Sequence, residues 1–138
     1  MYSHQHKIRI RYAETDQMGI VYYGNYATFY EIARVEALRA LNFRYKLMEE
    51  SGVMLPVLEN HSKFLHPAYY DEEITIKTTI RALPTVKVWF DFEIFNEAHK
   101  LIHTGSTLLV FMKTDTRKPC RAPEDLLELL RPYFPEKA

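Results

Sequence analysis

The sequence predicts an α+β fold in which a five- to six-stranded antiparallel sheet wraps one long helix. The apolar residues first alternate, then recur at helical spacing once, and then alternate again through most of the remaining chain. A run of strands after a single long helix is typical of α+β proteins. The helix must bury its apolar side, and the concave face of a twisted sheet offers the largest apolar surface for it.

The first strand and the long helix are predicted on either side of a glycine-containing loop. Residues 8–12 alternate between apolar and basic side chains, which indicates a short half-buried strand. The loop 13–24 follows, and Asn25 is expected to cap the helix through its side-chain oxygen. The helix is predicted from five residues at helical spacing, namely Tyr26, Tyr30, Ala33, Ala37 and Leu41.

The rest of the chain is predicted to be mostly strand. A short helical stretch covers 45–50, and strands are expected at 53–58, 62–65, 74–80, 86–94 and 101–112. The last of these is apolar on both faces, as a central strand should be. Pro123 and the acidic residues after it predict a terminal helix through Arg131.

Length and charge limit the possible functions. The 138 residues are expected to form one domain, 1–138, and 18 basic residues balance 18 acidic ones. Without net charge there is no long-range field to attract nucleic acid, so an anionic ligand would need a local basic cluster. The apolar runs are short for a membrane span, the start of the chain does not resemble a signal peptide, and Cys120 is the single cysteine. We therefore expect a cytoplasmic protein with a bystander thiol.

The loop before the long helix holds the densest group of chemically useful residues. The unpaired N–H groups at a helix start can stabilise an oxyanion, and Gly24 lets a ligand approach that backbone. Asp16 could then attack a carbonyl carbon or deprotonate a water molecule. The alternative is structural: Thr15 and Asp16 shape a turn, and Gly24 merely enters the helix.

The same loop carries a family resemblance. The segment 16–26, DQMGIVYYGNY, followed by FYEIAR at 29–34, resembles the signature of the 4-hydroxybenzoyl-CoA thioesterase family, which includes YbgC-like acyl-CoA thioester hydrolases. The stretches 64–72 and 117–119 are also similar to that family. The resemblance implies a hotdog fold, hydrolysis of a small or medium acyl-CoA to acid and CoA, no cofactor, and homodimers that associate into homotetramers.

The resemblance also implies roles for individual residues. Asp16 matches the catalytic carboxylate, as nucleophile or as general base. Tyr23 matches the residue whose backbone N–H polarises the thioester carbonyl, a position where many YbgC-like members have His. Gly24 and Tyr26 would border the substrate, although Asn25 and Tyr26 fit capping and packing better than chemistry. Another branch of hotdog thioesterases uses a helix glutamate, but the three-residue spacing of Glu31 and Glu36 to arginines fits surface ion pairs.

Coenzyme A carries phosphates, which basic side chains would hold. The segment 113–121 contains four basic residues and one acid, and we expect Arg117 and Lys118 to bind the phosphates, with Lys63 and Lys87 as further candidates. A solvated loop is the alternative, and family members commonly have Asp where Lys113 stands. The six histidines show no metal-binding spacing, so no metal site is expected.

Two other functions remain open. One is a non-catalytic module that binds acyl-CoA or acyl-carrier protein, and the other is a hotdog hydratase or dehydratase, although its usual pairing of His with an acid is not seen. Because joining two sheets side by side removes an exposed edge, we expect a subunit interface, placed on the strand 89–95.

Overall fold

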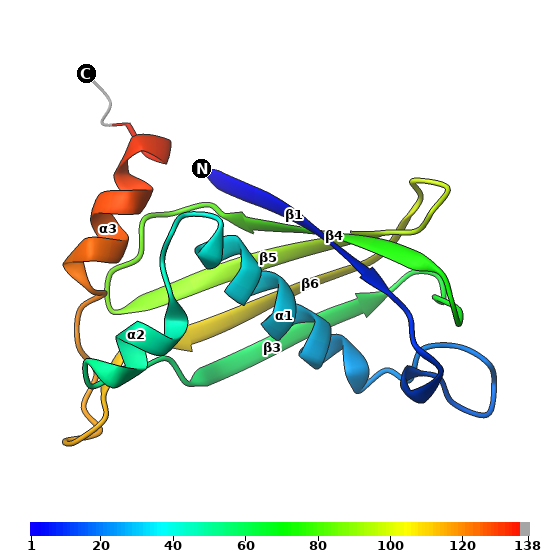
Figure 1. Cartoon of the computed structure of the whole chain (residues 1–138), viewed down its shortest axis with the longest axis horizontal. Helices are drawn as coiled ribbons and strands as arrows, with labels where there is room; N and C mark the ends of the chain where they lie inside the picture. Colours follow the sequence, from blue (N-terminus) through cyan, green and yellow to red (C-terminus); the bar gives the residue numbers. More distant parts are fainter. Residues whose placement is uncertain (136–138) are drawn as a thin grey trace.

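The computed structural model describes residues 1–135 and has an α+β architecture (Figure 1). The elements in chain order are β1 (Tyr2–Arg9), a 3₁₀ turn (Tyr12–Glu14), α1 (Asn25–Arg39), α2 (Tyr45–Glu50), β2 (Val53–Met54), β3 (Val57–Phe64), β4 (Glu73–Ile80), β5 (Lys87–Phe95), β6 (Leu101–Val110), β7 (Met112–Lys113), α3 (Glu124–Leu130) and a second 3₁₀ turn (Arg131–Tyr133). The main sheet has the order β1-β4-β5-β6-β3, and every neighbouring pair is antiparallel. The predicted α+β class is confirmed, and the antiparallel sheet, expected to have five or six strands, has five.

The core lies between α1 and one face of this sheet. α1 crosses that face (Figure 1) and buries Phe29, Tyr30 and Ala33 completely or nearly so. β5 alternates buried and more exposed residues, whereas β6 ends in four consecutive buried ones. The alternating pattern that predicted β5 thus corresponds to a strand covered on one face. The apolar run that predicted β6 corresponds to a strand that is more fully covered.

Several strand boundaries differ from the sequence prediction. β1 begins at Tyr2 and ends at Arg9, because its polar residues pair along the whole of β4, from Tyr2 opposite Ile80 to Arg9 opposite Glu73. The strands expected at 53–58 and 62–65 are instead the short β2 and the continuous β3. The polar residues 59–63 hid the continuity of β3, since a strand at a sheet edge needs no apolar alternation.

The predicted cap of α1 is wrong. Gly24 occupies the N-cap position, and no side chain caps the helix there. The Asn25 amide Nδ2 instead donates to the Glu14 carbonyl oxygen at 2.8 Å. Asn25 therefore ties the preceding loop to the first turn of α1.

The edges of the main sheet are β1 and β3. β5 pairs with β4 on one side and β6 on the other, so the interface expected on residues 89–95 cannot form by edge pairing. All eight residues of β3 are exposed. No helix within residues 1–135 is long and apolar enough to cross a membrane.

Candidate active site at the start of helix α1

The loop that carries Asp16 is closed by its own hydrogen bonds. The Asp16 N–H donates to the Ile20 carbonyl at 2.9 Å, and the Gly19 N–H returns to the Asp16 carbonyl at 3.0 Å. Gly19 has φ +77°, a left-handed conformation that suits glycine. The Met18 N–H donates to Asp16 Oδ1 at 2.9 Å, which orients the half-buried carboxylate.

Glu14 anchors this loop, a role that the sequence analysis missed. Its buried carboxylate accepts from the Arg11 backbone N–H at 2.7 Å, with the Arg11 guanidinium at 3.4 Å. Its carbonyl accepts from the Tyr22 N–H at 3.0 Å and from Asn25. The three-residue spacing of Arg11 and Glu14 was the available signal, because a Glu at the third position of a turn can reach back to the N-cap N–H.

Asp16, Tyr23 and Tyr26 share one pocket of about 340 Å³. The pocket is lined by Asp16, Met18, Ile20, Val21, Tyr23, Tyr26, Phe64, Leu65, His66 and Pro67. The structure thus brings together Asp16, Tyr23 and Tyr26, which were predicted as the catalytic carboxylate, the backbone donor to the carbonyl and a substrate-bordering residue. Gly24, the other residue predicted to border the substrate at the helix start, is not among the residues that line this pocket.

The backbone at the start of α1 offers a hydrogen-bond donor. The Asn25 N–H donates to the Tyr22 carbonyl at 2.9 Å and the Tyr26 N–H to the Tyr23 carbonyl at 3.3 Å. Within the described part of the chain, no protein group accepts from the N–H of Tyr23. This donor lies beside a helix N-terminus, where partial positive charge favours a developing negative charge.

An aromatic cluster forms the inner wall of the pocket. The ring of Tyr26 stacks on His103 with centroids 4.1 Å apart and an interplanar angle of 3°, and Phe64 meets His103 edge-on at 4.9 Å. Burial raises the pKa of Tyr26 to about 12 and lowers the pKa of His103 to about 4. Both side chains are therefore uncharged near neutral pH. The position of His103 could not be predicted from its local sequence.

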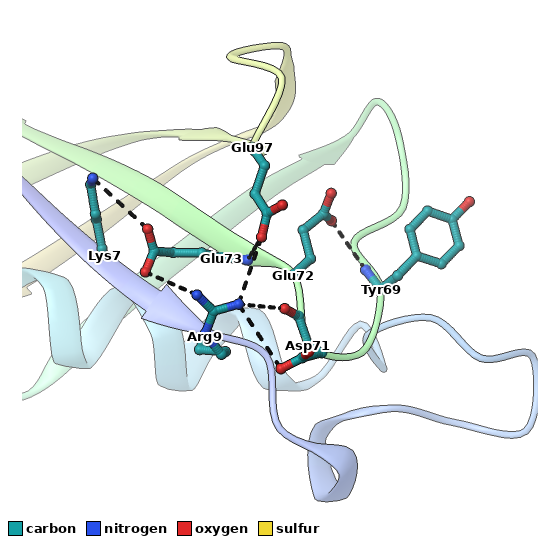
Figure 2. A network of polar contacts seen from close by, with 7 residues as sticks. All are labelled: Lys7, Arg9, Tyr69, Asp71, Glu72, Glu73 and Glu97. Carbon is teal, nitrogen blue, oxygen red and sulfur yellow. Dashed lines mark hydrogen bonds and ion pairs between the residues drawn. The ribbon is translucent and has the colours of Figure 1, made fainter.

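An arginine-centred network holds the end of the loop between β3 and β4, which lines the pocket through His66 and Pro67. Arg9 Nη1 donates to the Asp71 carbonyl at 2.6 Å, and its guanidinium also lies 3.5 Å from Glu73 and 3.7 Å from Glu97 (Figure 2). Asp71 belongs to the loop between β3 and β4, which also carries His66 and Pro67. Backbone hydrogen bonds join this loop to the Asp16 loop, for example from Val21 N to the Ala68 carbonyl at 2.9 Å.

The predicted phosphate-binding residues do not line this pocket. Lys63 lies on β3 opposite Thr104, and Lys87 is the first residue of β5. Arg117 and Lys118 follow β7, and their loop contacts the end of α2 through a hydrogen bond from Thr114 N to the Gly52 carbonyl at 2.9 Å. In Figure 1 this loop lies near α2, whereas the Asp16 loop lies beyond the start of α1, on the opposite side of the view.

The alternative acidic residues and the metal prediction can also be placed. Glu36 forms the expected ion pair with Arg39 at 3.4 Å on the surface of α1. Glu31 is exposed, and the ion pair expected between it and Arg34 does not form in the described part of the chain. Neither glutamate lines the pocket. Residues 1–135 contain no group of three or more His, Cys, Asp or Glu side chains placed to hold a metal ion.

Comparison with known proteins identifies similar chains. The family model described as "Thioesterase-like superfamily" matches residues 10–130. The protein named "Putative acyl-CoA thioesterase YneP" from Bacillus subtilis is 33% identical over 86% of this chain and 86% of its own length. The acyl-CoA thioester hydrolase YbgC from Escherichia coli is 28% identical over 87% of this chain and 90% of its own. A DHNA-CoA thioesterase structure from Staphylococcus aureus superposes with a TM-score of 0.89 and 38% identity, covering 94% of this chain and 89% of that one.

Proposed function

This chain belongs to the thioesterase-like superfamily, and we propose that it hydrolyses acyl-CoA thioesters to the free acid and CoA at the pocket beside Asp16. The names of its relatives support acyl-CoA thioesterase activity. One observation carries the assignment to this pocket: the Asp16 carboxylate and the start of α1, where the N–H of Tyr23 has no protein acceptor among the described residues, border the same cavity. α1 would be the central helix of a hotdog fold.

The geometry suggests how the thioester is activated. The thioester carbonyl oxygen accepts a hydrogen bond from the Tyr23 N–H, which stabilises the negative charge that develops when the carbonyl carbon is attacked. This role needs only the backbone, so the tyrosine in place of histidine does not impair it. Gly24, as the N-cap, keeps side-chain bulk away from this point.

Asp16 drives the attack by one of two routes. As a nucleophile, its carboxylate forms an acyl anhydride and expels CoA as the thiolate, after which water cleaves the anhydride. As a general base, it takes a proton from a water molecule that attacks the carbonyl directly. In either route Met18 N–H holds Oδ1, leaving Oδ2 to react.

We further propose that two copies pair through β3 as a homodimer that associates into a homotetramer. An antiparallel β3–β3 pair would satisfy the backbone groups of this fully exposed edge. β2 and β7 lie together just before β3 begins, whereas Phe64 at its end lines the Asp16 pocket. Antiparallel pairing therefore brings the Arg117–Lys118 loop of one copy toward the Asp16 pocket of the other, where it would meet CoA phosphates.

The first experiment measures thiol release from a panel of acyl-CoAs by the wild type and by Asp16→Asn. We expect a loss of at least about 100-fold in kcat for the variant, because general-base or nucleophilic assistance is removed. Asp125→Asn is the matched control, since Asp125 Oδ1 also accepts a backbone N–H but lies on α3. Wild-type turnover by Asp16→Asn would refute the role of Asp16. Tight acyl-CoA binding without thiol release by the wild type would favour the non-catalytic binding module.

A second experiment tests the assembly and the phosphate contacts. Light scattering should give a mass that is two or four times 16.4 kDa, and a monomer would refute the β3 pairing. Arg117→Ala combined with Lys118→Ala should raise KM for an acyl-CoA but not for the same acyl group on pantetheine, which lacks the nucleotide phosphates. Equal effects on both substrates would refute the phosphate assignment.

A further inference from the structure

The inner face of β3 carries a row of polar side chains beside the pocket. Asn60, Ser62 and Phe64 alternate along this strand and lie opposite Thr107, Gly105 and His103 of β6, on the face that α1 covers. Phe64 lines the Asp16 pocket, and Ser62 is the next residue on the same face, about 7 Å along the strand. An acyl group that passes Phe64 along β3 would reach Ser62.

Ser62 ends a chain of hydrogen bonds that begins in the core. Its Oγ lies 2.7 Å from the Tyr30 hydroxyl, which in turn contacts Nε2 of the fully buried His103. His103 is neutral because burial lowers its pKa to about 4, so one ring nitrogen carries a proton and the other does not. The direction of the chain therefore depends on which nitrogen is protonated.

The other ring nitrogen indicates that direction. His103 Nδ1 is buried and has no hydrogen-bond partner among residues 1–135. If Nδ1 carried the proton, the core would hold an unpaired N–H, which is rarer in proteins than an unpaired acceptor. The favoured arrangement has Nε2–H donating to Tyr30 and the Tyr30 hydroxyl donating to Ser62 Oγ. The proton of Ser62 is then free to donate away from the core.

Asn60 is oriented in the same way. The buried Thr107 hydroxyl donates to Asn60 Oδ1 at 2.6 Å, which directs the two N–H groups of Asn60 away from that contact. In both cases the hydroxyl of a buried residue, Tyr30 or Thr107, donates to an oxygen of an exposed side chain, Ser62 or Asn60. The hydrogen-bond donors of Ser62 and Asn60 are therefore not used by these contacts. Pairing of β3 with a second copy would use backbone groups and leave these side-chain donors available.

We propose that Ser62 is a specificity-determining residue that donates a hydrogen bond to an oxygen atom on the acyl group, about one strand repeat beyond Phe64 along β3. The substrate class is therefore an acyl-CoA whose acyl part carries a hydroxyl or carbonyl oxygen at that distance. This inference rests on the proposed thioesterase function. It states which residue recognises the end of the acyl group that is remote from the scissile bond.

The test compares hexanoyl-CoA with 6-hydroxyhexanoyl-CoA, which differ by one terminal oxygen. For the wild type we expect kcat/KM to be about fivefold to tenfold higher for the hydroxylated substrate, the effect of one hydrogen bond. Ser62→Ala should bring the ratio to about one, because the donor to the terminal oxygen is lost. Tyr30→Phe should lower the ratio, because Ser62 loses the partner that orients it.

Ser106→Ala is the matched control, because Ser106 lies on β6 opposite His61 and faces the other side of the sheet. It should keep the wild-type ratio. The inference is overturned if the wild type shows no preference or if Ser62→Ala retains it. Calorimetry of the two corresponding non-hydrolysable CoA thioethers measures binding without hydrolysis, and so separates the two proposals. A binding preference without turnover of either thioester would refute the proposed thioesterase function alone. Turnover without a preference would refute the role of Ser62 alone.

Discussion

Acidification should destabilise this protein through His103. The imidazole is fully buried, stacks on Tyr26 and contacts the Tyr30 hydroxyl through Nε2. Burial lowers its pKa from 6.5 to about 4, because the charged form loses its hydration in the core. In the unfolded chain the same residue is solvated and binds a proton at a higher pH.

The sign and size of the effect follow from this difference in pKa. Between pH 6.5 and about 4 the unfolded state binds a proton that the folded state does not, so the free energy of unfolding falls as the pH falls. A difference of about 2.5 pKa units corresponds to about 3 kcal/mol over the whole interval. Between pH 7 and pH 5 the expected loss is about 2 kcal/mol.

Urea denaturation at pH 7, 6 and 5 measures this loss for the wild type and for His103→Phe. The variant keeps an aromatic ring against Tyr26 but does not titrate at this position. Burial also lowers the pKa of His4, but that residue is present in both proteins and its contribution cancels in the comparison. The wild type should lose about 2 kcal/mol more than the variant on going from pH 7 to pH 5. Equal losses in the two proteins would refute the reasoning.

Two further substitutions test the packing and the ion pairs. A Cβ on Gly105 would overlap the Tyr30 hydroxyl oxygen, so Gly105→Ala should lower the free energy of unfolding in urea by about 2–3 kcal/mol. Adding Tyr30→Phe should recover part of this loss. An unchanged stability of Gly105→Ala would contradict the close packing. Arg9→Ala should lower the free energy of unfolding by about 0.5–1 kcal/mol at low salt and by less at 1 M salt, since the ion pairs of Arg9 with Glu73 and Glu97 are solvent-exposed. A loss of stability that does not depend on salt would show that charge is not the cause.

The sequence predicted the parts of the fold that depend on local periodicity. α1, α2, β4, β5 and α3 lie within one to three residues of their expected positions, because apolar spacing and turn residues signal these elements directly. The prediction failed where pairing with another strand, and not the local pattern of apolar residues, defines the element. β3 contains mostly polar residues and becomes a strand only because β6 pairs with it.

Some residues of the candidate site could be predicted from the sequence and others could not. Asp16, Tyr23 and Tyr26 are close in sequence, so their shared pocket was foreseeable from one loop and the helix start. Phe64 joins this pocket from an edge strand 38 residues after Tyr26, and His103 supports it from β6. No local signal marks such residues, because only the register between β3, β6 and α1 brings them together.

Local sequence patterns were enough to predict the fold class, the loop that bears the carboxylate and the helix start beside it, since each depends on residues that are close together in the chain. Long-range pairing makes β5 an internal strand and β3 an exposed edge. It also joins the loop that carries Arg117 and Lys118 to Gly52, so that neither residue lines the Asp16 pocket of its own chain. The tertiary structure also decided that Ser62, Tyr30 and His103 form one hydrogen-bonded chain. The physical reason is that strand order and cross-strand register arise from long-range pairing, which no short stretch of sequence encodes.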